Sequence, residues 1–270
     1  MCGLGRNLNG RESVFSRTHT RVMKNKDTKP TVFNQYFYHP DLSQPTIKLS
    51  AEESEHCCRA LRHREGDEVF LTDGHGREAR AIVMVADPKA CVLEIKEVKE
   101  EVGTRKLHLH IAIAPTKNAD RIEWFVEKSV EIGVEAITFL ICDHSERPRV
   151  NLDRLRRVAI AALKQCQTTW LPTMEVLTFN EFIEKQRPWV ANRYIAWCDD
   201  KNTRQFAAEP FTAKEVVLLI GPEGDFSERE IASAREAGYT EVKLGNRRLR
   251  TETAGLYGCL VVATHELFWQ

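Results

Sequence analysis

The chain has 270 residues, which is enough for two domains that each bury a core. Its 39 Lys and Arg residues balance its 39 Asp and Glu residues, so the bulk charge gives no signal for nucleic acid. A local basic face would still suffice for RNA. No apolar run approaches the roughly 20 residues that span a bilayer, so we expect no membrane partner.

The eight cysteines are scattered, with no C-x-x-C motif and no Cys/His pairing at zinc spacing. Cys57 and Cys58 are adjacent, which is a poor arrangement for a disulfide between them. We therefore expect free thiols in a cytoplasmic protein, and no metal site.

Residues 1–33 are polar, rich in Arg, Asn, Lys and Thr, and show little periodicity. They lack the apolar core of a signal peptide and a long amphipathic pattern. Such a segment cannot bury enough apolar surface to offset its ordering entropy, so we expect a disordered extension.

Residues 34–102 predict a small β domain. An aromatic strand begins near residues 36–38, and residues 79–85 and 92–98 alternate between apolar and polar side chains. The turn dipeptides of residues 73–76 separate strands of this kind. A β meander that closes into a small barrel is the simplest fold for this pattern.

Basic residues cluster ahead of the barrel strands in this domain, at His56, Arg59, Arg62, His63 and Arg64. Arginine is well suited to phosphate contacts, so RNA binding is one interpretation. The alternative is an ordinary solvated helix face.

Strands and helices alternate in residues 103–270. Strands are expected at residues 107–114 and 136–142, and an Asn118-capped helix that Gly133 closes lies between them. A second helix is expected at residues 152–166. This alternation predicts a parallel sheet with helices on both faces.

Two glycine-containing loops dominate the last third of the chain. A buried strand at residues 216–220 runs into the turn of residues 221–224, and a second strand at residues 240–244 runs into a loop of residues 245–254. Open α/β sheets bind ligands at the carboxyl ends of their strands. The alternative is that these glycines only form tight turns.

Two flanking helices are expected beside these loops. Ser227 and Glu230 have capping-box spacing at the start of one helix. The closing helix carries a stripe of apolar residues at helical spacing: Leu256, Cys259, Leu260, Ala263 and Leu267. This stripe fits either a core or a dimer seam.

The first strand of residues 103–270 ends in Pro115, Thr116 and Lys117 rather than in a glycine-rich fingerprint. A Rossmann-type methyltransferase or dehydrogenase carries such a fingerprint after its first strand. The order of motifs therefore disfavours that class.

Three blocks in order closely resemble the C-terminal motifs of a known family: residues 220–224, residues 244–245 and residues 249–254. The family is the 16S ribosomal RNA (uracil-1498-N3)-methyltransferases, the RsmE family of the SPOUT superfamily. The resemblance runs from about Gln35 to the end. It implies a PUA-like β-barrel over residues 34–102 and a SPOUT α/β domain with a deep trefoil knot over residues 103–270.

The resemblance also implies an enzyme. It would transfer a methyl group from S-adenosylmethionine to N3 of a uridine in 16S ribosomal RNA of the small ribosomal subunit. No metal is needed. A homodimer is expected, with the last helix supplying part of the interface.

Site residues follow from the positions that match the family motifs. The cofactor-binding residues implied are Ile220, Gly221, Pro222, Glu223, Gly224, Leu244, Gly245, Leu249, Arg250, Thr253 and Ala254. Arg250 and Glu252 are the candidate catalytic residues, although Glu252 could instead cap the last helix or pair with Arg250. The implied RNA contacts are His56, Arg59, Arg62, Lys117, Arg121 and Arg147.

The chain departs from the family pattern at Lys164, Cys166 and Thr168, and at Gly224-Asp225, where relatives have a Gly-Gly pair. These departures affect the expected RNA-facing rim and leave the cofactor loops whole. Two alternatives stay open: a SPOUT methyltransferase with another target, such as a transfer RNA ribose, and a non-catalytic RNA-binding homologue. Intact cofactor loops argue against the second.

Overall fold

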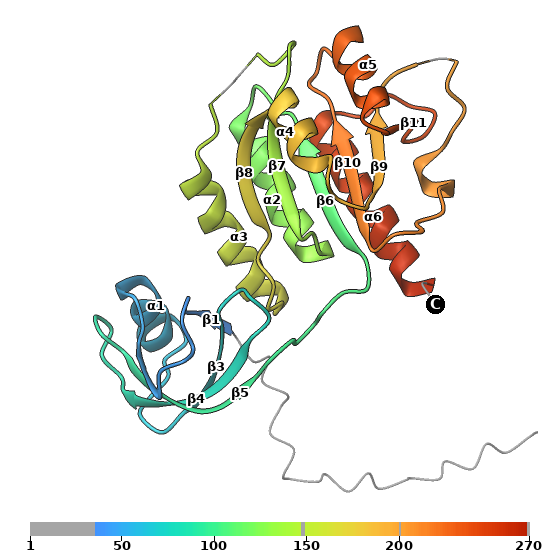
Figure 1. The fold of residues 1–270 in the computed structure, drawn as a ribbon. Helices are drawn as coiled ribbons and strands as arrows, with labels where there is room; N and C mark the ends of the chain where they lie inside the picture. The colour runs from blue at the N-terminus through green and yellow to red at the C-terminus, as the bar shows by residue number, and fades with distance from the viewer. Residues whose placement is uncertain (1–35, 147–148, 200, 269–270) are drawn as a thin grey trace, which may run out of the picture. The chain divides into compact units, whose positions relative to one another are not determined.

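The computed structural model describes residues 36–146, 149–199 and 201–268, which contain two β-sheets (Figure 1). The extension expected over residues 1–33 and the site candidate Arg147 lie outside these ranges. Of the helices in the described ranges, none combines the length and the apolar character needed to cross a bilayer.

The first sheet is small and mostly antiparallel. Its segment contains β1 (Tyr36–Tyr38), β2 (Thr46–Lys48), α1 (Ala51–Glu55), the π-helical turn η1 (His56–Ala60), β3 (Glu68–Thr72), β4 (Glu78–Val85) and β5 (Val92–Lys99). The strand order is β1-β3-β4-β5-β2, and only the β1–β3 pair is parallel. The meander expected from residue alternation is therefore confirmed as β3-β4-β5.

The alternation places one face of β4 in a core. Ala79, Ala81 and Val83 are buried, and they pack in one cluster with Phe37 and Leu71. The residues between them are half-buried, as expected for a sheet with one covered face.

The second sheet is larger and entirely parallel. Its segment contains β6 (His108–Ile113), α2 (Ala119–Ile132), β7 (Ala136–Ile141), α3 (Leu152–Cys166), β8 (Thr173–Thr178), α4 (Phe179–Gln186), β9 (Asn192–Ala196), the 3₁₀ turn η2 (Phe206–Ala208), β10 (Glu215–Ile220), α5 (Glu228–Glu236), β11 (Thr240–Val242) and α6 (Thr251–Phe268). The strand order is β11-β9-β10-β6-β7-β8. This confirms the expected α/β class.

Helices cover both faces of this sheet, as predicted (Figure 1). Ile111 and Ile113 of β6 pack in the core on the side of α2, α3 and α6. Ala112 belongs to the opposite core, which includes residues of α4 and α5. Successive side chains of a strand point to opposite faces, so one short strand contributes to both cores.

Local signals explain the first helices of this domain. Asn118 accepts a hydrogen bond from the Asp120 amide at 2.9 Å and so caps α2. Gly133 ends α2 with a φ of 104°, a conformation that favours glycine. Asn151 caps α3 by accepting from the Arg154 amide at 3.0 Å. The expected bounds of α3 are confirmed.

The last helix begins earlier than the sequence suggested. We expected a loop through residue 254, whereas α6 starts at Thr251. Glu252 thus lies in the first turn of α6, where a carboxylate interacts favourably with the helix dipole. The second strand also ends early, at Val242 rather than residue 244. The backbone of Lys243 instead bonds to a crossing segment, accepting from Phe206 at 3.0 Å and donating to Arg204 at 2.8 Å.

The residues of the expected apolar stripe of α6 differ in their burial. Cys259 is fully buried, whereas Leu260 is 49% exposed and Leu267 is 81% exposed. The buried face contains two glycines that the stripe did not include. A Cβ at Gly258 would lie 2.5 Å from Leu218, and one at Gly255 would lie 2.7 Å from the Phe125 ring of α2. Glycine therefore lets α6 approach α2 and the sheet closely.

One of the departures from the family pattern has a structural role. Lys164 of α3 forms an ion pair with Glu53 of α1. Nearby, the Trp170 indole donates to the Val102 carbonyl at 2.8 Å. A Cβ at Gly76 would lie 2.4 Å from the Trp170 ring, so this turn needs glycine. The segment after α3 therefore contacts residues of the first sheet's segment directly.

Candidate active site

The two glycine loops lie on the same edge of the parallel sheet. Residues 221–227 follow β10, residues 243–250 follow β11, and both strands pair with β9 in parallel. Their carboxyl ends therefore meet at one edge. The Lys243 bonds to the segment after β9 hold the second loop against that edge. The expectation that both loops follow the carboxyl ends of strands is confirmed.

The loop after β10 is fixed by Asp225. Its amide donates to the Pro222 carbonyl at 2.9 Å, and its carboxylate accepts from the Cys198 amide at 2.9 Å. The second bond ties this loop to the end of β9. Asp225 has a φ of 62°, which is uncommon for a residue other than glycine but tolerated by Asp. The departure from a Gly-Gly pair thus has a local role.

The glycines of the first loop pack mainly against protein. A Cβ at Gly221 would lie 3.1 Å from the Phe226 ring, and one at Gly224 would lie 3.2 Å from His144. Gly245 is different, because its φ is 117° and a Cβ there would meet no described atom within 4 Å. Space beside the backbone is thus open at Gly245.

The start of α6 joins the two loops. The Thr251 hydroxyl donates to the Gly221 carbonyl at 3.2 Å. The Ala254 amide donates to the Arg250 carbonyl at 2.8 Å, which closes the first turn of the helix. The motif residues of both loops therefore converge on the N-terminus of α6.

A cavity of about 320 Å³ lies beside this helix start. It is lined by Asp120, Arg121, Trp124, Arg250, Glu252 and Thr253. Both candidate catalytic residues are thus brought together, with Thr253 from the expected cofactor set. Arg121, expected as an RNA contact, lines the same cavity.

Two lining residues were missed by the sequence reasoning. Asp120 and Trp124 come from the exposed face of α2, and Trp124 is 41% exposed. Trp124 lies three residues after Arg121, a spacing that puts both on one side of a helix. An exposed tryptophan at that spacing was the available signal.

Glu252 is the buried member of the cavity lining, and it lies beside the half-buried Arg121. The Arg121 guanidinium donates to Glu223 at 3.3 Å, and its Nε lies 3.7 Å from Glu252 Oε1. The Glu252 side chain is 8% exposed. Its Oε2 atom has no hydrogen-bond partner among the described residues. A buried carboxylate is costly unless it is paired, so the arrangement links Glu252 to Arg121 rather than to Arg250.

The other expected RNA contacts lie elsewhere. His56, Arg59 and Arg62 are exposed on and after η1, and Arg59 pairs with Glu55 at 2.7 Å. Lys117 is exposed and pairs with Glu146 at 3.0 Å. These residues do not line the cavity.

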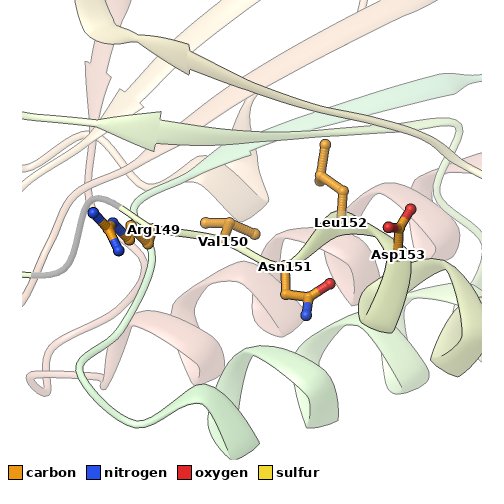
Figure 2. Close-up of a pocket in the computed structure, with 5 residues that line it drawn as sticks. All are labelled: Arg149, Val150, Asn151, Leu152 and Asp153. Atoms are coloured by element: carbon orange, nitrogen blue, oxygen red, sulfur yellow. The ribbon is translucent and has the colours of Figure 1, made fainter.

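A second hollow, of about 470 Å³, lies at the start of α3 (Figure 2). One continuous stretch, residues 149–153, lines it, and Figure 2 shows Asn151 and Leu152 pointing to opposite sides of that stretch. Although larger, this hollow gathers no groups from separate elements. We therefore favour the smaller cavity as the functional one.

Comparisons with known families match both segments of the chain. A family model described as an RNA methyltransferase domain matches residues 104–263. The chain belongs to the RNA methyltransferase family. A second model, an RNA methyltransferase PUA domain, matches residues 49–96.

Three relatives in this family illustrate the similarity. A probable rRNA-methyltransferase from Porphyromonas gingivalis has 37% identity and a TM-score of 0.80, over 87% of this chain and all of that one. A ribosomal RNA small subunit methyltransferase E from Neisseria gonorrhoeae, solved bound to S-adenosylmethionine, has 26% identity and a TM-score of 0.76, over 86% of this chain and 97% of that one. The enzyme of the same name from Bacillus subtilis has 26% identity over 239 residues, which are 81% of this chain and 90% of the relative.

Proposed function

We propose that this chain methylates N3 of a uridine in 16S ribosomal RNA, with S-adenosylmethionine as the methyl donor. The observation that carries the proposal is the meeting of both glycine loops and the start of α6 beside a cavity that contains Arg250 and Glu252. Family membership and the relatives' names support the same reaction and the same substrate.

The residues present fit S-adenosylmethionine. Open space beside the Gly245 backbone and the exposed residues 246–250 offer main-chain groups to a small molecule. The expected set, residues 220–224, 244–245, 249–250 and 253–254, would hold it. The cofactor supplies an electrophilic methyl group when bound, and the protein supplies binding and orientation.

Uridine N3 carries a proton and becomes a nucleophile only when that proton leaves. The uracil ring then carries negative charge, which a nearby guanidinium can stabilise. Arg250 is exposed at the cavity and does not pair with Glu252, so Glu252 does not compete with such a charge for its guanidinium. Glu252 instead pairs with Arg121.

Finer features of the fold belong to the same proposal. We infer domains at residues 34–102 and 103–270, supported by family matches within each range. The small sheet would close as a PUA-like barrel. A trefoil knot of the SPOUT type would arise where the segment after β9 crosses α6. The His265 ring lies 3.1 Å from the Ala207 carbonyl and 4.7 Å from the Phe211 ring, which supports this crossing.

We infer that the partners are the small ribosomal subunit, in the cytoplasm, and a second copy of the chain. His56, Arg59 and Arg62 would contact RNA phosphates from the small domain. The exposed apolar face of α6, which includes Leu260 and Leu267, would form the dimer seam.

Methyl transfer in vitro tests the function. The full chain is incubated with S-adenosylmethionine labelled in its methyl group and either small-subunit 16S RNA or transfer RNA. Label that enters only the 16S RNA, and is recovered as 3-methyluridine, supports the proposal. Label in transfer RNA ribose would favour the other SPOUT target, and cofactor binding without transfer to either RNA would favour a non-catalytic homologue.

A further inference from the structure

Three cysteine sulfurs lie together in the small domain. Cys57 and Cys58 belong to η1, and Cys91 directly precedes β5. Their Sγ atoms all lie within 4.8 Å of one another, and those of Cys57 and Cys91 are 3.9 Å apart. Cys57 and Cys91 are fully buried, whereas Cys58 is half-buried. The cluster is therefore closed on the core side and accessible at Cys58.

The spacing fits ligands around one cation. With Zn–S bonds of about 2.3 Å, two thiolates of a tetrahedral zinc site lie roughly 3.8 Å apart. A disulfide requires sulfurs only about 2.0 Å apart. The distance of 3.9 Å between Cys57 and Cys91 is close to the first arrangement, and the remaining sulfur pairs lie within 4.8 Å.

The backbone that carries these sulfurs is held by hydrogen bonds. The turn η1 closes through a bond from the Leu61 amide to the His56 carbonyl at 3.0 Å. Such π-type turns are rare and frequently occur at functional sites. Adjacent residues of a regular helix point about 100° apart, yet here both Cys57 and Cys58 reach Cys91.

Cys91 is fixed on the other side of the cluster. Its amide donates to the Ser54 hydroxyl at 3.0 Å, and its carbonyl accepts from the Leu49 amide at 3.0 Å. The three ligand positions are thus arranged before any ion binds, which lowers the cost of ordering a site.

We propose that Cys57, Cys58 and Cys91 bind one soft closed-shell cation, Zn²⁺ or Cu⁺, as thiolates. Thiolate sulfur selects such soft cations over hard ones. Each thiol loses its proton to solvent as its bond to the metal forms. Cu⁺ is satisfied by three thiolates, whereas Zn²⁺ would take a water as its fourth ligand from the accessible side at Cys58.

Two simpler interpretations explain fewer features of this cysteine cluster. Buried cysteines often act as small apolar side chains, but that role does not require three sulfurs within bonding reach of one point. A redox disulfide would require the Cys57 and Cys91 sulfurs to move from 3.9 Å to about 2.0 Å apart, and it would involve only two of the three sulfurs. A single cation, by contrast, accommodates all three.

A bound cation would also stabilise a small domain. Its core is a single cluster that includes Phe37, Leu71 and Leu93 together with Cys57 and Cys91. Domains of this size are marginally stable without additional cross-links. Metal bound by the folded state alone adds its binding free energy to folding.

Anaerobic titration of the reduced full-length chain tests the site. Zn²⁺ and Cu⁺ are each added in competition with a chromophoric chelator, and thermal unfolding is followed in parallel. We expect one equivalent of at least one cation to bind and to raise the melting temperature. Cys58→Ala and, separately, Cys91→Ser should each weaken binding by at least about tenfold. Cys198→Ser, which removes an exposed thiol outside the cluster, should bind as the parent does.

The two variants keep the test decisive. Cys91 is buried, so its variant is first checked for folding by circular dichroism, whereas Cys58 is half-buried and tolerates truncation better. Binding of Zn²⁺ alone or of Cu⁺ alone would identify the cation. The proposal is overturned if neither ion binds, or if folded Cys58→Ala binds as tightly as the parent.

Discussion

Arg250 and Glu252 are two residues apart but occupy opposite environments. Arg250 is exposed at the cavity, and Glu252 is buried against Arg121. Arg250→Ala should therefore leave the fold intact and remove charge stabilisation of the deprotonated uracil. We expect a methylation rate about a hundredfold lower or more, even with RNA and cofactor saturating. Single-turnover kinetics measure this rate.

Arg247 provides the matched control, because it is an exposed arginine of the same loop that does not line the cavity. Arg247→Ala should keep the parent rate. Equal rates for Arg250→Ala and Arg247→Ala would show that Arg250 takes no part in the reaction.

His110 gives the fold a pH dependence. Burial lowers its pKa to about 4 from an ordinary 6.5, with Lys185 adding to the shift and Glu175 opposing it. The ring lies 2.8 Å from the Thr138 hydroxyl. The unfolded chain takes up a proton near pH 6.5, so the contribution of neutral His110 is complete above that pH. It is lost as pH falls toward about 4, by up to roughly 3 kcal/mol.

Urea unfolding of the parent and of His110→Gln, at about pH 7 and about pH 5, measures this effect. The free energy of unfolding of the parent should fall more steeply toward acid than that of the variant. Identical falls would show that other groups control the acid sensitivity.

Single residues also mark the limits of reasoning from sequence. The glycine loops were identified correctly as a convergence point, because their spacing matches a family motif. The structural role of Gly221 could not be predicted from the sequence, because a Cβ added there would first meet the Phe226 ring, five residues away. A Gly221→Val variant would therefore disturb the loop itself before it reported on cofactor binding. Trp124 was missed although its spacing of three residues from Arg121 puts both side chains on one side of a helix.

At the scale of elements, the basic residues on and after η1 do not line the cavity. Among them, Arg59 and Arg62 are exposed. If they contact phosphates, changing both to alanine should weaken RNA binding and reduce the slope of log affinity against log salt by up to about two contacts, each roughly 0.7 to 0.9. Filter binding across a salt series measures the slope. Binding of S-adenosylmethionine should not change.

Arg187→Ala is the control for this pair, because Arg187 is an exposed arginine of the larger domain paired with Glu184. It should keep the parent slope. An unchanged slope in the double variant would show that the cluster is only a solvated face. Lys117 and Arg121 would then be the candidates for RNA contact.

Elements with strong local signals were predictable. The cap Asn118 and the closing Gly133 were identified from the sequence and fix α2. The sequence also places α3 correctly, although its cap Asn151 was not identified. The last helix was predicted less well, since Thr251 begins it inside a motif that resembled a loop. Its glycines are explained only by their close contacts with Phe125 and Leu218. Tertiary contacts of this kind produce no periodic pattern in the sequence.

At the scale of the whole molecule, α6 has apolar residues on two faces. One face is buried against α2 and the sheet, and the other exposes Leu260 and Leu267. We expect a homodimer through the exposed face. Light scattering at micromolar concentration should give twice the chain mass, and Leu260→Glu should shift it toward the monomer.

Val190→Glu serves as its control, because Val190 is 85% exposed and lies in the loop between α4 and β9 rather than on α6. It should remain dimeric. A parent that scatters as a monomer would contradict the proposed seam.

The α/β class followed from alternating strand and helix patterns, but the strand order β11-β9-β10-β6-β7-β8 did not. Order depends on which strands pair across the chain, and residue alternation within one strand carries no such information. The three-sulfur cluster was missed for the same reason, since Cys91 is far in sequence from Cys57 and Cys58.

The central claim is that this chain methylates N3 of a uridine in 16S ribosomal RNA. Nucleoside mass spectrometry of ribosomal RNA from a strain that lacks the gene tests it most directly, with the parent strain and a strain restored with the intact gene beside it. We predict that 3-methyluridine at one 16S position is absent from the deletion strain and returns on restoration. A deletion strain with undiminished 3-methyluridine in its 16S RNA would contradict the account.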